Sequence, residues 1–214
     1  MTTRAVSNLP STLRSFACDR DGVSATEFAL ILPFMLTLYV GGIELGDGIA
    51  INFKTTLAAR TVADLASQCG VCTVPPGNNG VIDAANMQSI LNTSAKVLSP
   101  YNQAPYLTSN LLITTLSELK VSPNQTQGAV QWSCSLNGTA HSFGSTINIP
   151  NNTQLNQLTT DIYILYSEVS FPYTPSLGYV ISGTIWINQG VLFSPRLATQ
   201  ITPPTSSQLA LCKP

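Results

Sequence analysis

A single carboxylate, Glu27, lies near the start of a long apolar stretch, within "RDGVSATEFALILPF" at residues 20–34. An ionisable side chain in a membrane-length apolar segment costs roughly 2.5 to 3.5 kcal/mol near the bilayer centre, and less towards the interface. Either Glu27 extends its carboxylate to the interface, as long charged side chains can, or it has a function that requires a charge at this place.

Cysteines form the second set of residues that could do chemistry. Cys18 precedes the apolar stretch, and the other four follow it: Cys69, Cys72, Cys134 and Cys212. If the apolar stretch crosses a membrane, the four lie together on the exported side. An even set in an oxidising compartment predicts a disulfide framework, and four cysteines permit three pairings, among which the sequence does not choose.

Cys69 and Cys72 form a C-x-x-C motif, which is found in redox proteins. Thioredoxin-like chemistry needs that motif at the start of a helix, where the helix dipole lowers the thiol pKa. Here the motif follows the end of an expected helix, so we expect a structural disulfide role. Zinc binding by the four exported cysteines is the weaker alternative, because thiols pair with one another in oxidising compartments.

Residues for acid–base catalysis are sparse. His141 is the only histidine, in a Ser/Gly-rich stretch with no Cys or carboxylate near it in the sequence. Asp161 and Glu168 fall on an expected strand and form no convincing acid–base pair. No phosphate-binding glycine loop, Gly-x-Ser-x-Gly or His-Glu-x-x-His motif is present. The sequence therefore predicts no catalytic residue, no bound metal and no cofactor.

The element that positions Glu27 is an apolar segment from Ala25 to Ile43, in which Glu27 is the only charged residue. At about 1.5 Å per residue, this segment just crosses a hydrocarbon core of roughly 30 Å as a helix. Three arginines precede it, and the first basic residue after it is Lys54. The positive-inside rule predicts a cytoplasmic N-terminus and an exported C-terminal part. A cleaved secretory signal is the alternative, although Gly42 to Gly48 offers a poor cleavage site.

Charged residues make up 9% of the 214-residue chain, against a usual share of about 25% in soluble domains. The formal net charge is -1, and no Lys/Arg block is present. This composition excludes the basic surface that nucleic-acid binding needs, so we expect no nucleic-acid partner.

The chain is predicted to have four parts: a cytoplasmic leader (1–22), a hydrophobic helix (23–45), an amphipathic extension of that helix (46–68) and an exported domain (69–214). Pro33 and Gly41-Gly42 predict a kink or local melting within the helix. The extension is expected to pack on the exported domain through a face that recurs at helical spacing: Ile49, Phe53, Leu57, Val62 and Leu65.

The exported domain is predicted to contain a short helix, capped by Asp83 and running to about Leu98, and then four strands. These strands are rich in β-branched and aromatic residues, and they lie in residues 110–122, 128–138, 161–173 and 179–193. Trp132 and Trp186 are expected to pack in the core and on the sheet. The predicted fold class is α+β, with a mostly antiparallel sheet.

The stretch "GVSATEFALILP" resembles the processing and assembly motif of TadE/TadG-like minor pseudopilins from tight-adherence (Tad/Flp) pilus systems. The matching residues are Gly22, Glu27, Phe28 and Pro33. The resemblance implies that a prepilin peptidase cleaves after Gly22, which makes Val23 the mature N-terminus. Glu27 then lies one helical turn from the new α-amino group. In a bundle, its carboxylate can pair with the amine of a neighbour, because an unpaired charge in an apolar environment is costly.

The resemblance implies a minor pseudopilin that takes part in initiating or regulating pilus assembly, and so supports adhesion and biofilm formation. Implied partners are the major pilin, other minor pseudopilins, the prepilin peptidase and the inner-membrane assembly platform. The implied location is the inner membrane, with the C-terminal domain in the periplasm. Beyond residues 20–45 only the layout is similar. There are two alternatives. One is an uncleaved single-pass membrane protein with an exported domain that binds a ligand or a partner, and the other is a secreted redox protein.

Overall fold

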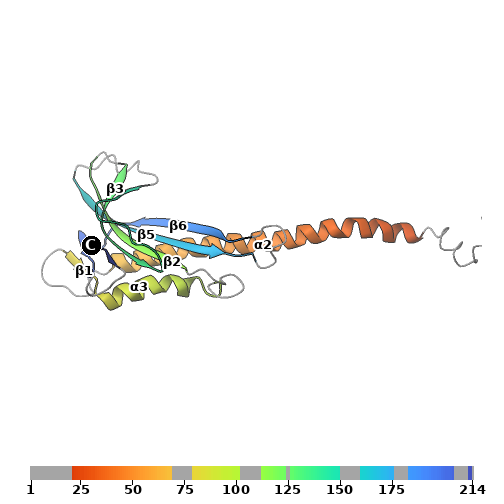
Figure 1. Cartoon of the computed structure of the whole chain (residues 1–214), viewed down its shortest axis with the longest axis horizontal. Helices are drawn as coiled ribbons and strands as arrows, with labels where there is room; N and C mark the ends of the chain where they lie inside the picture. Colours follow the sequence, from red (N-terminus) through yellow and green to blue (C-terminus); the bar gives the residue numbers. More distant parts are fainter. Residues whose placement is uncertain are drawn as a thin grey trace, which may run out of the picture. The chain divides into compact units, whose positions relative to one another are not determined.

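The computed structural model describes residues 21–68, 79–101, 112–123, 126–149, 160–175, 183–204 and 212–213. Over these residues the chain is an α+β protein with a long N-terminal helix, a second short helix and an antiparallel sheet (Figure 1). The chain divides into two compact units, Met1–Leu45 and Gly46–Pro214. All of the strands belong to the second unit, and we call the part of this unit from residue 79 onwards the head.

Helix α2, Asp21–Ser67, is continuous over 47 residues. Its end confirms the prediction of a helix that runs to about Gln68. The sequence predicted a kink or local melting, and the melting is wrong, because helical structure continues through Pro33 and through Gly41-Gly42. The kink stays a prediction. Each glycine costs about 1 kcal/mol relative to alanine, which is too little to interrupt a helix supported on both sides by long apolar runs.

The second half of α2 packs on the head through a different face from the one predicted. Ile49, Phe53, Leu57 and Leu65 are exposed, and Val62 is the only member of the predicted face that is buried. The buried face is built mainly of small side chains: Ile51, Thr55, Ala58, Ala59, Val62, Ala63 and Ala66. Small side chains let a helix lie close to a sheet, so the alanines make the interface.

Helix α3, Ala84–Val97, begins where the sequence predicted. Asp83 is its N-cap and accepts a hydrogen bond from the backbone N–H of Asn86 at 2.7 Å. The buried side is formed by Met87, Ile90, Leu91 and Ser94. After the helix ends, the ammonium group of Lys54 on α2 donates to the carbonyl oxygen of Ser99 at 2.6 Å, which ties the two helices together.

The four predicted strands are present and pair antiparallel. They are β2 (Ile113–Val121), β3 (Gln127–Leu136), β5 (Ile162–Tyr173) and β6 (Ile185–Phe193). Their order in the sheet is β3-β2-β5-β6. The last strand begins at Ile185, later than the predicted residue 179.

Four short strands were not predicted, because two or three residues are too few to show a periodicity. β4 (Thr146–Asn148) and β8 (Cys212–Lys213) both pair with β3, which gives the sheet six strands. β1 (Asn79–Val81) and β7 (Gln200–Thr202) form a separate parallel pair.

Both helices cover one face of the sheet (Figure 1). Val62 of α2 and Met87 of α3 share a buried cluster with Leu165 of β5. Nearer the start of the head, Ile51 of α2 shares a second cluster with Tyr173, at the end of β5. β5 therefore runs along the second half of α2 in the opposite direction to the helix.

Candidate functional site

The expected processing site lies at the beginning of α2. Gly22 and Val23 are in the first turn of the helix, whose first residue is Asp21. Val23 and Glu27 are separated by four residues, so they lie on the same side of the helix, one turn apart. The pairing of the Glu27 carboxylate with the α-amine of a neighbouring subunit stays a prediction.

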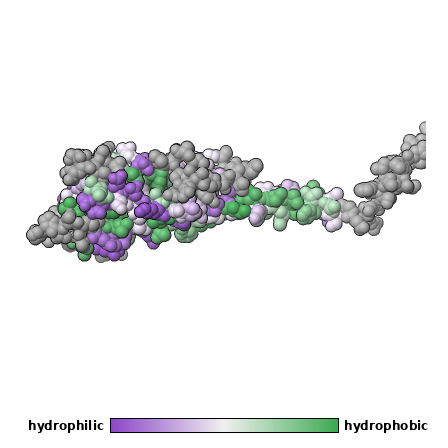
Figure 2. Space-filling view, turned by 90° about the horizontal axis from the view of Figure 1, so that it is seen from below, coloured by the Kyte–Doolittle hydropathy of each residue, from purple (hydrophilic) through white to green (hydrophobic). Residues whose placement is uncertain are grey.

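Apolar side chains around the first half of α2 are exposed, as Figure 2 shows in green along the described part of this helix. Phe28 is 66% exposed and Phe34 is 73% exposed, and Glu27 and Pro33 are also exposed. α2 is long and apolar enough to cross a membrane by length and composition. Exposed apolar surface of this extent is costly in water, so the helix serves as a single-pass membrane anchor.

An apolar stripe continues on the second half of α2, on the side that does not pack on the head. We define the stripe as Ile49, Phe53 and Leu57, which recur at four-residue spacing. Their side chains are 50%, 71% and 54% exposed. The stripe follows directly on the membrane-length segment in the sequence.

Residues 22–64 match the family model of TadE-like proteins. The match confirms the resemblance seen in the sequence and extends it from the membrane-length segment to the second half of α2. Over this segment the chain is similar to TadE-like proteins of the Tad pilus system. No curated protein and no solved structure matches the chain. The TadE-like match covers none of the strands, so the head is described from its own structure.

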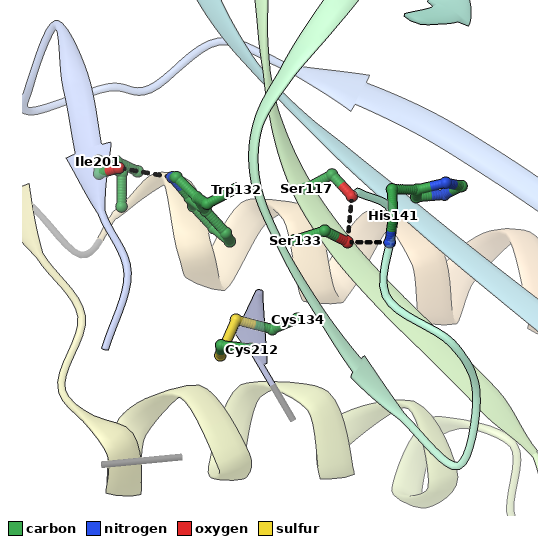
Figure 3. The surroundings of a disulfide bond; sticks show 7 residues. All are labelled: Ser117, Trp132, Ser133, Cys134, His141, Ile201 and Cys212. Atoms are coloured by element: carbon green, nitrogen blue, oxygen red, sulfur yellow. Dashed lines mark hydrogen bonds between the residues drawn. A yellow bond between two sulfur atoms is a disulfide. The ribbon is translucent and has the colours of Figure 1, made fainter. Parts of the chain in front are cut away.

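The head contains one disulfide among the described residues, between Cys134 and Cys212 (Figure 3). These residues lie opposite each other in the β3–β8 pair, with Cα atoms 4.0 Å apart, and both are buried. The bond selects one of the three pairings that the sequence left open. Cys69 and Cys72 lie outside the described residues, so their predicted structural role stays a prediction.

A buried carboxylate, Glu118, joins β2 to β7. Its Oε1 accepts the backbone N–H of Ile201 at 2.7 Å, and its Oε2 accepts the indole N–H of Trp132 at 3.1 Å. The same indole N–H lies 2.7 Å from the carbonyl oxygen of Ile201 (Figure 3). Burial raises the pKa of Glu118 to about 7, although these hydrogen bonds and one from the side chain of Gln200 act in the opposite direction.

A second polar cluster lies on the sheet face opposite the helices. His141 Nε2 is 2.6 Å from Glu168 Oε2, so the fold brings this histidine beside a carboxylate that is 27 residues away in the sequence. Glu168 also hydrogen-bonds Tyr166, whose pKa burial raises to about 12. The hydroxyl of Ser133 accepts the backbone N–H of His141 at 3.1 Å and a hydrogen bond from Ser117 at 2.9 Å (Figure 3). These contacts fasten the loop of His141 to the sheet.

Neither polar cluster has the groups that a metal site requires. Among the described residues, no three His, Cys, Asp or Glu side chains are placed to hold a metal ion. Sequence reasoning missed both clusters, because Glu118 and Ile201 are 83 residues apart and His141 and Glu168 are 27 apart. The sequence carried one signal of the Glu118 cluster. Glu118 follows Leu116 by two residues and so lies on the apolar face of the same strand, where a buried carboxylate needs hydrogen-bond partners.

Proposed function

We propose that this chain is a minor pseudopilin that takes part in initiating or regulating the assembly of a Tad-type pilus, and so supports surface adhesion and biofilm formation. The observation that carries the proposal is the TadE-like match over residues 22–64, which includes Gly22, Glu27, Phe28 and Pro33 in their expected order. The TadE-like family is not known for enzymatic activity, so we infer a role in assembly without catalysis.

The proposed topology follows from charge and apolarity. Residues 1–22 form a leader in the cytoplasm, 23–45 cross the inner membrane, 46–68 extend the helix outside it, and 69–214 form the periplasmic domain. The three arginines before the apolar segment support this orientation. A disulfide between Cys134 and Cys212 supports export, because such bonds persist in oxidising compartments.

Processing is tested by expressing the full chain with its cognate prepilin peptidase and determining the N-terminus of the membrane-extracted product. We expect a chain that begins at Val23. Gly22→Leu places a bulky side chain at the scissile bond and should block cleavage, whereas the matched control Gly41→Ala, where an added methyl group meets nothing within 4 Å, should be cleaved normally. If residues 1–22 are retained while the peptidase is active, the chain is better explained as an uncleaved single-pass protein with a ligand-binding exported domain.

Glu27 is proposed to set the register between subunits by pairing with the α-amine of a neighbouring Val23. Glu27→Gln keeps the size of the side chain and removes its charge, so it should be processed normally but enter pili poorly. Glu27→Asp keeps the charge on a shorter side chain and should be partly active. The measurement is the amount of the chain in sheared pilus fractions, relative to the amount in the membrane. Normal incorporation of the glutamine variant would contradict the pairing.

The apolar stripe of α2 supports assembly with other pilus subunits, namely the major pilin and other minor pseudopilins held by the inner-membrane platform. A face formed by Ile49, Phe53 and Leu57 offers a helical partner the four-residue spacing of a packing ridge. Phe53→Ser should reduce crosslinking to partner subunits while leaving the unfolding temperature of the head unchanged, because Phe53 is already exposed. Arg60→Ser, at another exposed position of α2, is the control. Equal crosslinking by both variants would contradict the proposal that the stripe contacts partner subunits.

A further inference from the structure

The end of the head where β5 stops and β6 begins contains two exposed apolar side chains. Ile185 pairs with Tyr173, and Trp186 pairs with Pro172. Ile185 is 39% exposed and Trp186 is 45% exposed. Trp186 therefore lies on a strand of the sheet but not in the core, and its exposed surface needs an explanation. Trp132, the other tryptophan, is buried at 3% exposure.

This end of the sheet lies beside the part of α2 that follows the apolar segment. A β-carbon at Gly48 would be 3.8 Å from the ring of Tyr173, and Tyr173 shares a buried cluster with Ile51. Gly48 follows Ile43, the last residue of the apolar segment, by about 7 to 8 Å of helix at ~1.5 Å per residue. The polar headgroup layer of a bilayer is about 5 to 8 Å thick on each side. Tyr173 therefore lies beside a residue that follows the apolar segment along the chain by about the thickness of that layer.

The chemistry of this end suits a lipid interface. No charged residue occurs in the sequence between Glu168 and Arg196, so all of β6 and the end of β5 are uncharged. Tryptophan is enriched where proteins meet the headgroup layer, because its ring is apolar and its indole N–H needs a polar partner. A basic surface would favour anionic lipids, but here the contact depends on apolar area alone and does not require them.

We propose that Ile185 and Trp186 contact the headgroup layer of the membrane that α2 crosses, so that the head rests on the bilayer before the protein enters a pilus. The occupant of this surface is a lipid bilayer and not a protein. The inference depends on α2 spanning a membrane, and it does not depend on cleavage after Gly22 or on pilus assembly. It holds equally for a minor pseudopilin and for an uncleaved single-pass protein.

The test is depth-dependent quenching of tryptophan emission from the full chain in phosphatidylcholine vesicles. One set of vesicles contains nitroxide lipids labelled at the headgroup or near the top of the acyl chain, and another contains lipids labelled near the end of the acyl chain. The emission of Trp186 is obtained by subtracting the emission of the Trp186→Phe variant from that of the native chain. We expect several-fold stronger quenching of this difference by the shallow nitroxides than by the deep ones, and the same quenching when anionic lipids are added.

A matched control moves the tryptophan reporter to another exposed position, far from this end of the head. Phe143 is 66% exposed, and its neighbour Gly144 donates its backbone N–H to the carbonyl oxygen of Val130 at 2.8 Å. Through Leu119, Val130 lies level with Ile164 of β5. From Ile164 to Tyr173 the strand rises about 30 Å at ~3.3 Å per residue. When Phe143→Trp is introduced into the Trp186→Phe chain, the emission that it adds should therefore not be quenched by the shallow nitroxides.

Two quenching results overturn the proposal. One is Trp186 emission that aqueous iodide quenches and the nitroxide lipids do not. The other is equal quenching of the native reporter and of the reporter introduced by Phe143→Trp, which would mean that the bilayer does not distinguish the two ends of the head. Resistance of each variant to carbonate extraction is measured in parallel. Loss of that resistance would show that α2 does not span the membrane and would count against the proposed function as well as against the inference.

Discussion

Replacing Glu118 with glutamine should remove most of the pH dependence of the stability of the head between about pH 4.5 and pH 7. Glu118 is fully buried, and burial raises its pKa from 4.5 to about 7. The folded head therefore binds a proton at this carboxyl more tightly than the unfolded chain does. The resulting stabilisation is complete below about pH 4.5 and is lost as the pH rises through about 7.

The magnitude follows from the two pKa values. A tenfold change in an acid constant corresponds to about 1.4 kcal/mol, so a pKa raised from 4.5 to about 7 corresponds to about 3 kcal/mol. This is a large fraction of the 5 to 15 kcal/mol by which domains are typically stable, on the order of one third. Glutamine keeps an oxygen that can accept the N–H of Ile201, but its amide faces the indole N–H of Trp132. The variant is therefore less stable at low pH.

The assay is guanidinium unfolding of the full chain in detergent micelles, followed by tryptophan emission at a series of pH values. We expect the free energy of unfolding of the native chain to fall by about 3 kcal/mol across this range, relative to Glu118→Gln. The two proteins share every side chain except the one at position 118, so the difference between their curves reports that position alone. Parallel curves for the native chain and the variant would refute the reasoning.

Two further predictions concern stability. Replacing both Cys134 and Cys212 with serine should lower the free energy of unfolding by about 2 to 5 kcal/mol, whereas Cys18→Ser should leave it unchanged; guanidinium titration of the non-reduced proteins measures both. Gly190→Ala would place a β-carbon 2.9 Å from the ring of Tyr166, so it should displace that ring and cost about 1 to 3 kcal/mol by the same titration. An unchanged midpoint for Gly190→Ala would mean that the ring moves aside without loss.

Local patterns were enough to predict the α2 helix, the cap of α3 and the four long strands. In each case the signal is carried by neighbouring residues, such as Asp83 before an amphipathic run or the alternating side chains of residues 161–173. The motif around Glu27 was equally local, and the family match confirms the resemblance drawn from it.

The face of α2 that packs on the head could not be predicted by periodicity. Phe53 and Leu57 carry more apolar area than Ala58 and Ala59, so a pattern weighted by hydrophobicity selects the exposed side. The structure prefers the small side, because close approach of helix and sheet gains contacts that a single side chain's area does not measure. The contacts of Glu118 and His141 were unpredictable for another reason, since strand order and a β-bulge beside Glu118 bring distant residues together.

The disulfide between Cys134 and Cys212 also determines how the head responds to mechanical force. If the chain enters a pilus, as we propose, it bears tension along the fibre, and a chain pulled from its two ends lengthens as it unravels. The bond closes a covalent ring with a sequence separation of 78 residues, and this ring contains β4 to β7. At about 3.5 Å per residue, roughly 270 Å of chain is withheld from extension while the bond is intact. The strands inside the ring, including β6 with its exposed Trp186, are therefore shielded from load in an oxidising compartment and would bear it only after reduction.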